Sequence, residues 1–451
     1  MDGKLILTQT IQEYIKQKNI IDLREIFDEY NIVDLADIVD QLDVYDIIFI
    51  FKTVTKDVTG QLFSYLDNDV IEHLLEVLNS DQIKVILNSL YSDDLIDFLQ
   101  ELPANLSKKV LNSASSQQKK LINELLQYQE DTAGSIMSTN YLELSKQDNI
   151  NDAIEKIKRY GSKAETIGTC FVLNEKGRLV GIVTLRDILF ASEDNMIKDI
   201  MDIDYNSVFT STDTEEVGRM MQKYDENVIA VTDEDYHLLG MITIDDIIDV
   251  MQEEATEDIH RMAAITPIEF PYLEASTFKL AQSRLVWLML LMVSYALSSI
   301  IITNNDQLLM MVPSLITFIP MLMDTAGNAG SQASAMVIRG IIVDSLTIKD
   351  FFKVVFKEMM IALMTGSVLF IVNMIRIVIF VNDVGFDIAV IVSLSVFLVV
   401  LIAKLSGALF PMLALIIKVD PAIMASPLIT TTCDLISILA YFGLARLWLG
   451  I

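Results

Sequence analysis

Five apolar runs dominate the second part of the chain. They cover residues 285–303, 308–323, 359–375, 388–417 and 421–445. Few charges interrupt them: Lys404 lies within the fourth run, Asp434 lies within the fifth, and Arg376 follows the third. A helix of about 20 apolar residues crosses the core of a bilayer. The pattern therefore predicts an α-helical membrane domain with five transmembrane helices over residues 276–451.

Residues 1–130 carry apolar positions at helical spacing throughout. The segments 34–42, 69–78 and 93–102 each begin with an acidic residue and repeat apolar residues three or four positions apart. A loose recurrence every few tens of residues is typical of stacked helical hairpins. We expect an all-α helical-repeat N domain here.

Residues 131–252 contain a duplicated pattern of another kind. The segment 177–190 recurs as 236–250, and 136–157 recurs in the same order as 200–221. Each copy predicts a short strand, a helix, two strands around a turn, and a closing helix. The copies resemble CBS domains, so we expect an α/β tandem CBS pair.

Each copy also contains a G-x-x-T-x-x-D element, with Thr184 and Asp187 in the first and Thr243 and Asp246 in the second. A threonine at a strand end and an aspartate at a helix start present oxygen atoms to a cleft. In CBS domains such a pair can hold the ribose of an adenine nucleotide, so ATP or a related nucleotide is a candidate cofactor. The alternative is that each pair only caps the following helix.

Net charge separates the two parts of the chain. The sequence has 62 acidic and 33 basic residues, and 52 of the acids and 23 of the bases precede residue 274. Residues 1–273 therefore carry the whole formal charge of −29. Such a domain repels itself, and cations relieve the repulsion. Nucleic acid is excluded as a partner because phosphate binding needs a basic surface.

Basic residues flank only some of the apolar runs. Lys279 and Arg284 precede the first; Arg339, Lys349, Lys353 and Lys357 lie between the second and third; Lys418 lies between the fourth and fifth. The loops at 304–307 and 382–386 carry none. The positive-inside rule then predicts a multi-pass protein of the inner or plasma membrane, with its N-terminal domains in the cytosol and its C-terminus outside. The chain begins without the pattern of a secretory signal peptide. Two cysteines without ligand spacing fit a reducing compartment.

The segment 253–275 connects the duplicated module to the membrane domain. It is acidic at its start and favours a helix. A plug-like helix in this position can transmit movement from the soluble domains to the membrane domain.

Asp434 is the sharpest candidate residue in the membrane domain. An ionisable group inside a membrane span is costly and usually functional. Thr430, Thr431 and Ser437 lie three or four residues away and share its helical face. The stripe predicts a water-lined pore; the alternative is a neutral aspartate in an interhelical hydrogen bond.

A second polar segment covers 320–335. Asp324, Asn328 and Gln332 follow one another at four-residue spacing, and Gly327 and Gly330 lie among several alanines. Small residues let neighbouring helices approach closely. The segment therefore predicts either a polar pore wall or a tight packing interface with incidental amides.

Specific motifs extend over nearly the whole chain. They are the helical array, the CBS pair, ATEDIH at 255–260, P-x-L-x-x-x-x-G-N-x-G-x-Q from 320, and DPA…PL-x-T-T-x-x-D from 420. Together they resemble the MgtE family of magnesium channels. The resemblance implies a non-enzymatic homodimer in a lipid bilayer with a pore between the two membrane domains. The candidate pore and ion-binding residues are Asp434, Thr430, Thr431, Asn328, Gly327, Gly330 and Gln332.

The resemblance also implies that cytosolic Mg²⁺ holds the pore shut. The matching candidate ligands are Asp93, Asp97, Asp213, Glu216, Asp225, Asp246, Asp249, Glu254, Glu257, Asp258 and Asp420. Physically, a divalent ion between acidic surfaces removes their repulsion and draws them together. The alternative is that most of these acids are merely solvated.

Magnesium fits the chemistry of the candidate pore, because Mg²⁺ prefers oxygen ligands and keeps its water. Co²⁺ and Mn²⁺ also accept octahedral oxygen, so a broader divalent cation transporter is one alternative. Another is a nucleotide-sensing membrane receptor, or an intramembrane enzyme with Asp324 and Asp434 as its acid pair.

Overall fold

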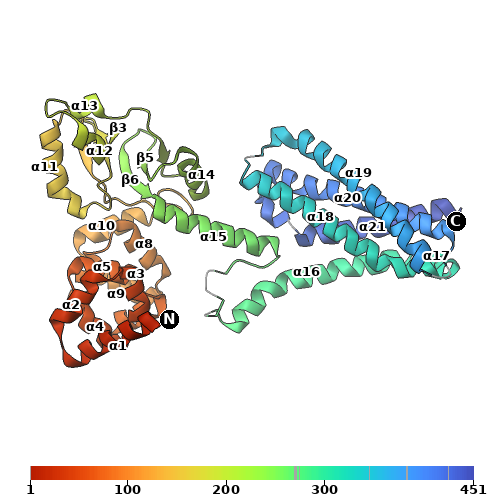
Figure 1. The fold of residues 1–451 in the computed structure, drawn as a ribbon, viewed down its shortest axis with the longest axis horizontal. Helices are drawn as coiled ribbons and strands as arrows, with labels where there is room; N and C mark the ends of the chain where they lie inside the picture. Colours follow the sequence, from red (N-terminus) through yellow and green to blue (C-terminus); the bar gives the residue numbers. More distant parts are fainter. Residues whose placement is uncertain are drawn as a thin grey trace. The chain divides into compact units, whose positions relative to one another are not determined.

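The computed structural model of the chain describes residues 2–268, 272–273, 275–344, 346–381, 384–424 and 426–450. Parts of the predicted linker at 253–275 and of the predicted loop at 382–386 lie outside the described residues. The chain divides into two compact units, residues 1–251 and 252–451; Figure 1 labels many of their elements.

Ten short helices open the first unit. They are α1 (Asp2–Gln17), α2 (Ile20–Glu29), α3 (Ile32–Val39), α4 (Val44–Thr53), α5 (Lys56–Ser64), α6 (Asn68–Val77), α7 (Ser80–Leu87), α8 (Ser92–Glu101), α9 (Ala104–Ser113) and α10 (Ser116–Leu125). Asn79 and Ser115 cap α7 and α10 through reciprocal bonds with a glutamine at the third helical position. Alternate helices pack together, α3 on α5 and α5 on α7. The predicted helical N domain is confirmed.

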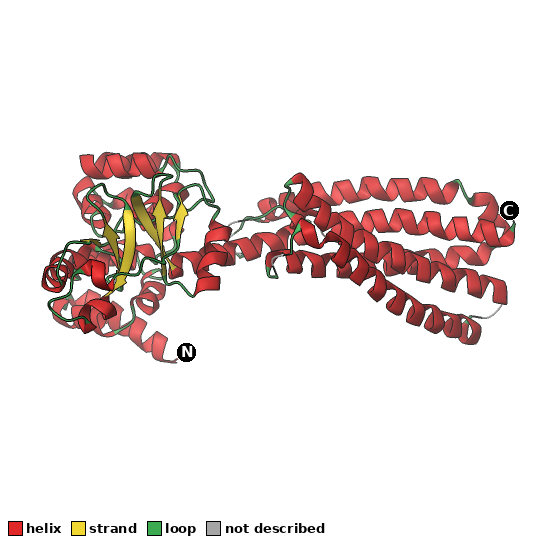
Figure 2. Cartoon of the chain, turned by 90° about the horizontal axis from the view of Figure 1, so that it is seen from above, coloured by secondary structure: helices red, strands yellow, loops and turns green. Residues whose placement is uncertain are grey.

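The duplicated module forms two similar α/β halves. The first contains β1 (Glu143–Ser145), α11 (Ile150–Tyr160), η1 (Gly161–Lys163), β2 (Thr169–Leu173), β3 (Leu179–Thr184), α12 (Leu185–Phe190) and α13 (Ile197–Ile200). The second contains β4 (Ser207–Phe209), α14 (Thr214–Tyr224), β5 (Val228–Thr232), β6 (Leu238–Thr243) and α15 (Ile244–Met262). The yellow strands of Figure 2 belong to these halves.

Both sheets have the same topology and register. Their orders are β1-β2-β3 and β4-β5-β6, the first pair parallel and the second antiparallel. Thr169 pairs with Thr184 in one sheet as Val228 pairs with Thr243 in the other. The equivalence confirms the predicted CBS pair.

Helix α15 runs without a break for 19 residues from the end of β6. The boundary between the two units falls inside it, at residues 251 and 252. The linker helix is therefore the direct continuation of the last CBS helix.

The second unit consists of α16 (Thr277–Thr303), α17 (Asp306–Met311), η2 (Pro313–Phe318), α18 (Ile319–Ile342), η3 (Ile348–Asp350), α19 (Phe351–Phe380), α20 (Phe386–Ile417), η4 (Pro421–Met424) and α21 (Ser426–Leu449). Among the described residues, four helical stretches are long and apolar enough to cross a membrane: 277–303, 348–380, 386–417 and 421–449.

The second predicted span does not form one continuous helix in the structure. Residues 308–323 divide between α17, η2 and the start of α18. Pro313 has no N–H to continue α17, and Val312 before it has a non-helical backbone, with φ of −133° and ψ of 76°, that ends the helix. The long helix is α18, whose 24 residues include the polar segment and are not among the four apolar stretches. The count of five spans stays a prediction.

Helix α18 packs very closely against α20 and α21. A Cβ added at Gly407 of α20 would lie 2.2 Å from the carbonyl oxygen of Gly330, and one at Gly330 would lie 2.7 Å from Ile429 Cγ2. The backbones approach each other where no side chain fits. The packing interpretation of 320–335 therefore holds for Gly330.

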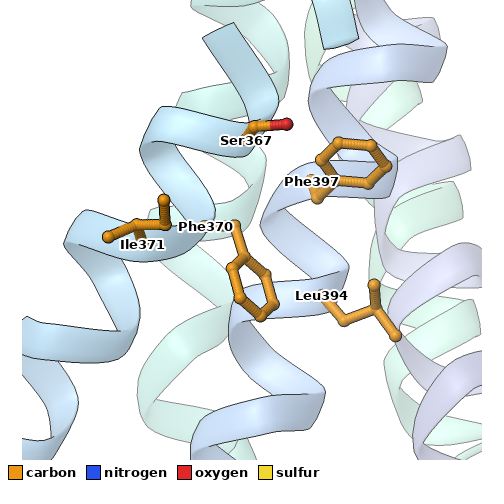
Figure 3. Close-up of a pocket in the computed structure, with 5 residues that line it drawn as sticks. All are labelled: Ser367, Phe370, Ile371, Leu394 and Phe397. Carbon is orange, nitrogen blue, oxygen red and sulfur yellow. The ribbon is translucent and has the colours of Figure 1, made fainter. Parts of the chain in front are cut away.

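An apolar hollow of about 390 Å³ lies at α19 and α20 (Figure 3). It is lined by Ser367, Phe370 and Ile371 of α19 and by Leu394 and Phe397 of α20. The Ser367 hydroxyl donates to the Leu363 carbonyl of its own helix at 2.7 Å. Because its one polar side chain is bonded to its own helix and its other lining side chains are hydrocarbon, this hollow is unsuited to a cation.

Candidate functional site

A second hollow, of about 420 Å³, has a different chemistry. We call it the polar hollow; its lining residues are Tyr295 of α16, Pro320, Met323, Asp324, Gly327, Asn328 and Ser331 of α18, and Thr430 and Asp434 of α21. Two carboxylates, an amide and three hydroxyl-bearing side chains thus line the hollow in the membrane unit. They are the hard oxygen groups that Mg²⁺ and similar cations prefer.

Asp434 is the most deeply placed of these groups. Its side chain is 6% exposed, and its buried Oδ1 has no hydrogen-bond partner among the described residues. A buried acceptor without a donor costs about 1–3 kcal/mol. The cost is removed when a cation or its hydration shell faces that oxygen. An interhelical hydrogen bond, the alternative role for Asp434, is not made by Oδ1.

Glycine and threonine bring α18 and α21 together beside Asp434. A Cβ at Gly327 would lie 2.8 Å from Thr430 Cγ2, so only glycine permits this approach. Ser331 Oγ and Thr430 Oγ1 lie 3.3 Å apart and share a hydrogen bond. The wall of the polar hollow is therefore fixed by direct contact between the two helices.

Several predicted pore residues do not line the polar hollow. Thr431 donates to the carbonyl of Leu428 at 3.0 Å, and the buried Ser437 donates to that of Cys433 at 2.5 Å. One residue turns a helix by about 100°, so Thr430 lies about 40° from Asp434 and Thr431 lies about 60° away on the other side. Residues four apart on α18 also differ by about 40° around the helix axis. Gln332, two such steps after Asp324, is therefore exposed and does not line the hollow. Gly330 serves the packing described above.

Three carboxylates meet in the first unit and form what we call the carboxylate cluster. Asp93 comes from the first turn of α8, Glu165 from the segment after η1, and Asp246 from the first turn of α15. One oxygen of each lies within 4.8 Å of the others. Asp93 is 7% exposed, and Asp93 Oδ1 and Glu165 Oε2 are buried without hydrogen-bond partners among the described residues. Three oxygen ligands around orphaned acceptors fit a divalent cation.

The electrostatics of the cluster show how unfavourable it is without a cation. Burial, with nearby Glu165 and Asp94, raises the pKa of Asp93 to about 9. Burial also raises the pKa of Glu165 to about 7, against a hydrogen bond from Ser138 that lowers it. Burial and the charge of nearby Asp246 raise the pKa of Asp94 to about 6. The group holds protons that a metal ion would displace.

Asn140 sets the geometry of the cluster. Its side-chain oxygen accepts a hydrogen bond from the Ser92 N–H at 3.1 Å, and its carbonyl accepts one from the Glu165 N–H at 2.9 Å. It thereby holds the start of α8 beside the first CBS half. Thr243 fixes the third member by donating to Asp246 Oδ2 at 2.5 Å.

The remaining acidic candidates of the first unit lie outside the cluster. Asp213 caps α14 by accepting from the backbone of Glu215 and Glu216, and Asp225 ends that helix in the left-handed conformation with φ of 55°. The side chains of Asp97, Glu216 and Asp249 are exposed. Asp213 and Asp225 therefore have structural roles of their own.

Acidic candidates of the second unit meet near the end of α15. Arg261 forms ion pairs with Glu257 of the same helix and with Asp420 from the connection between α20 and η4. Glu254 and Asp258 lie on α15 and are partly exposed.

The Thr–Asp pairs of the CBS halves are bonded to each other. Thr184 Oγ1 donates to Asp187 Oδ2 at 2.5 Å and accepts from the Asp187 N–H at 3.1 Å. Thr243 and Asp246 repeat the first of these bonds. The first pair, Thr184 and Asp187, therefore caps the start of α12, as the alternative interpretation expects. In the second pair, Asp246 also belongs to the carboxylate cluster.

Sequence reasoning missed three residues of these sites. Glu165 lies in an irregular segment where one acidic residue carries no signal. Tyr295 belongs to a uniformly apolar run. Arg261 was detectable, because Glu257 and Arg261 have the four-residue spacing of a helical ion pair.

Comparison with known proteins identifies the parts of the chain. Residues 319–444 match the family model described as MgtE, divalent cation transporter; residues 30–131 match the MgtE intracellular N domain; and residues 133–194 and 197–253 each match the CBS domain.

Relatives of known identity match over most of the chain. The magnesium transporter MgtE of Thermus thermophilus is 34% identical over 332 residues, which cover 73% of this chain and 72% of the relative. That of Bacillus subtilis is 33% identical over 355 residues, which cover 78% and 77%. A crystal structure of the soluble part of a magnesium transporter matches with a TM-score of 0.54 and 29% identity, over 56% of this chain and 99% of that one. The resemblance seen in the sequence is confirmed: the chain belongs to the MgtE family of divalent cation transporters.

Proposed function

We propose that this protein carries Mg²⁺ across the membrane into the cytosol through the polar hollow, with Asp434 as the principal ion-binding group. The observation that carries the proposal is the orphaned Oδ1 of Asp434 in a hollow lined by oxygen-bearing side chains. Mg²⁺ gives up its water reluctantly. A hollow of this size suits an ion that keeps part of its hydration shell.

A homodimer supplies the second carboxylate. One Asp434 leaves a divalent ion with a net charge of +1, whereas Asp434 residues from two chains neutralise it. The family resemblance supports a pore between two membrane domains. We place the chain in the cell membrane with its N-terminal domains in the cytosol and its C-terminus outside, on the distribution of basic residues around the apolar runs.

Cytosolic Mg²⁺ regulates the flow in this proposal. The carboxylate cluster supports it, because two of its three residues, Asp93 and Asp246, are candidates from the sequence and the third, Glu165, adds a ligand from a separate segment. Glu257 and Asp420 provide a second acidic position at the end of α15. Mg²⁺ bound there favours the closed state by the difference in its affinity for the two states.

An adenine nucleotide is the proposed ligand of the CBS pair. Thr184 and Asp187 support it, since their oxygens lie together at the end of β3 and the start of α12. Thr243 and Asp246 are less suited, because Asp246 belongs to the carboxylate cluster. Calorimetric titration of ATP into the full chain and into Thr184→Val measures this; equal heats from both would contradict the assignment.

The central test is magnesium flux into liposomes that contain the purified chain. Wild type should conduct Mg²⁺, and Asp434→Asn should reduce the flux at least tenfold while its thermal unfolding stays unchanged. The matched control is Ser437→Ala, a buried polar residue on the same helix but outside the hollow, which should conduct normally. Wild-type flux in Asp434→Asn would overturn the pore assignment. Competing Mn²⁺ or Co²⁺ in the same assay distinguishes a magnesium-selective protein from a broader divalent transporter.

A further inference from the structure

The polar hollow contains a second carboxylate besides Asp434. Asp324, in the second turn of α18, lines the hollow together with Asp434 of α21, and its charge acts on that of Asp434. Asp434 is 6% exposed, with an Oδ1 that has no hydrogen-bond partner among the described residues, whereas Asp324 is exposed in the single chain. An ionised side chain on a membrane helix is costly unless it faces water, protein or an ion. One chain therefore brings a buried carboxylate and an exposed one to the same hollow.

Two contacts show how α18 and α21 run beside each other. A Cβ at Gly327 of α18 would lie 2.8 Å from Thr430 Cγ2 of α21. Just before α18, the carbonyl of Leu315 accepts a hydrogen bond from the hydroxyl of Tyr441, later on α21, at 3.0 Å. Earlier residues of one helix thus lie beside later residues of the other, and the two helices are antiparallel.

This arrangement puts the two carboxylates at nearly one level. Asp324 precedes Gly327 by three residues, and Asp434 follows Thr430 by four. At a rise of about 1.5 Å per residue, they lie about 4.5 Å and about 6 Å from the contact between Gly327 and Thr430. Both lie in the same direction from that contact, because the helices are antiparallel. The two carboxylates therefore differ in level by only about 1.5 Å.

A pair of carboxylates at one level suits a hydrated divalent cation. Mg²⁺ keeps several of its waters and is commonly held by one or two carboxylates. The pair neutralises one divalent ion, whereas a monovalent ion leaves a net charge of −1. Because Coulomb attraction is proportional to the charge of the ion, each carboxylate attracts a divalent ion twice as strongly as a monovalent one. The second carboxylate therefore contributes both affinity and selectivity.

We propose that Asp324 is a second ion-binding residue of the polar hollow, which holds a hydrated divalent cation together with Asp434 of the same chain and makes the hollow prefer divalent to monovalent cations. The inference rests on the proposed transport through the hollow and adds a ligand to it. Asp434 stays the principal group, because its buried oxygen is the orphaned one. Asp324 sets how tightly the ion is held.

Mg²⁺ uptake by the full-length chain in liposomes tests this, measured over a range of external Mg²⁺ concentrations. The liposomes contain chelator, so that proposed regulatory sites facing the interior stay empty. Attraction between a carboxylate and a divalent ion across one layer of water changes affinity by about a factor of ten. Asp324→Asn, which keeps the size of the side chain, should therefore raise the Mg²⁺ concentration for half-maximal uptake about tenfold. Its maximal uptake and thermal unfolding should stay close to those of the wild type.

Two further variants separate charge from shape. Asp324→Glu keeps the charge and should have a half-maximal concentration close to that of the wild type. Asp306→Asn removes an exposed carboxylate at the start of α17, outside the hollow, and is the matched control that should change nothing. Because K⁺ loses half as much attraction as Mg²⁺ when Asp324 is neutralised, the ratio of K⁺ to Mg²⁺ that halves uptake should fall about threefold in Asp324→Asn.

Several outcomes would overturn the inference. An unchanged half-maximal concentration in Asp324→Asn would do so, because a lower maximal uptake alone indicates a structural role. Complete loss of uptake would show that Asp324 is needed for passage itself. A full shift in Asp324→Glu, or in Asp306→Asn, would show that the charge at position 324 is not the cause. Asp434→Asn is measured in the same preparation: wild-type uptake by that variant contradicts the proposed function, whereas an unshifted Asp324→Asn contradicts only this inference.

Discussion

Asp93 couples stability to both protons and metal. Its folded-state pKa of about 9 lies far above the ordinary value of 3.8. Between these values the folded chain holds a proton that the unfolded chain has released. The contribution of Asp93 to stability without metal is therefore greatest at low pH and falls as pH rises toward 9. Glu165, with a pKa of about 7, adds to the same fall.

Magnesium should reverse this dependence. The ion binds only deprotonated carboxylates, so the stabilisation by Mg²⁺ should increase as pH rises through the same range. Hydrogen exchange of the α8 amides in the full-length chain measures it. Protection without Mg²⁺ should decrease between about pH 6 and 9, and Mg²⁺ should restore it. Protection by Mg²⁺ that is independent of pH would contradict the cluster as the binding site.

Replacing Asp93 by asparagine separates the two effects. Asp93→Asn cannot take up or release a proton, so the metal-free stability of this variant should fall less between about pH 6 and 9 than that of the wild type. The same variant should lose most of the protection of α8 by Mg²⁺. Asp28→Asn, an exposed acid on α2, is the control and should change neither quantity.

Single residues differ in how far the sequence reveals them. Asp434 could be predicted because a charge inside an apolar run has few structural explanations. Glu165 could not, because its significance depends on Asn140, which bonds both the start of α8 and the Glu165 backbone. Neighbours brought together by folding leave no local pattern.

At the scale of elements, repetition made the CBS halves predictable down to their turns. The second long helix of the membrane domain begins later in the chain than predicted, and the reason is local. An uncharged run from 308 predicts a span, but Pro313 ends the first short helix, and α18 begins only at Ile319. Hydrophobicity decides where a chain can enter a membrane, whereas backbone hydrogen bonding decides where its helices begin.

The contact between α18 and α20 depends on one glycine pair. Gly407→Ala places a methyl group against the Gly330 carbonyl, where a Cβ would lie 2.2 Å away. The helices must separate, and overpacking of this kind costs about 1–3 kcal/mol. We expect a lower midpoint of thermal unfolding in detergent, together with reduced Mg²⁺ flux because α18 carries one wall of the polar hollow.

The control for this variant is Gly443→Ala on α21, where an added Cβ would meet no atom within 4 Å. It should unfold and conduct like the wild type. If Gly407→Ala were equally stable, the close approach of α18 and α20 would not contribute to the stability of the membrane domain.

At the scale of the whole molecule, the part of the chain that contains the proposed ion pathway differs in net charge from the part proposed to regulate it. Residues 274–451 contain the polar hollow and have equal numbers of acids and bases, whereas residues 1–273 hold the excess of negative charge. The carboxylate cluster lies entirely in the first unit, and the Arg261 ion pairs lie entirely in the second. Truncation can therefore remove one acidic position while retaining the other.

Two truncated chains test this division in the flux assay. Residues 276–451 lack the carboxylate cluster and keep only Asp420 of the second acidic position, so Mg²⁺ on the side of the N-terminal domains should no longer reduce the flux. Residues 252–451 keep Glu257, Arg261 and Asp420 and should retain a weaker response. Asp434→Asn in either background should abolish the flux, which shows that the remaining conduction passes through the same hollow. Full inhibition of the 276–451 chain by Mg²⁺ would place the regulatory ion inside the membrane domain, and the acidic first unit would then have another purpose.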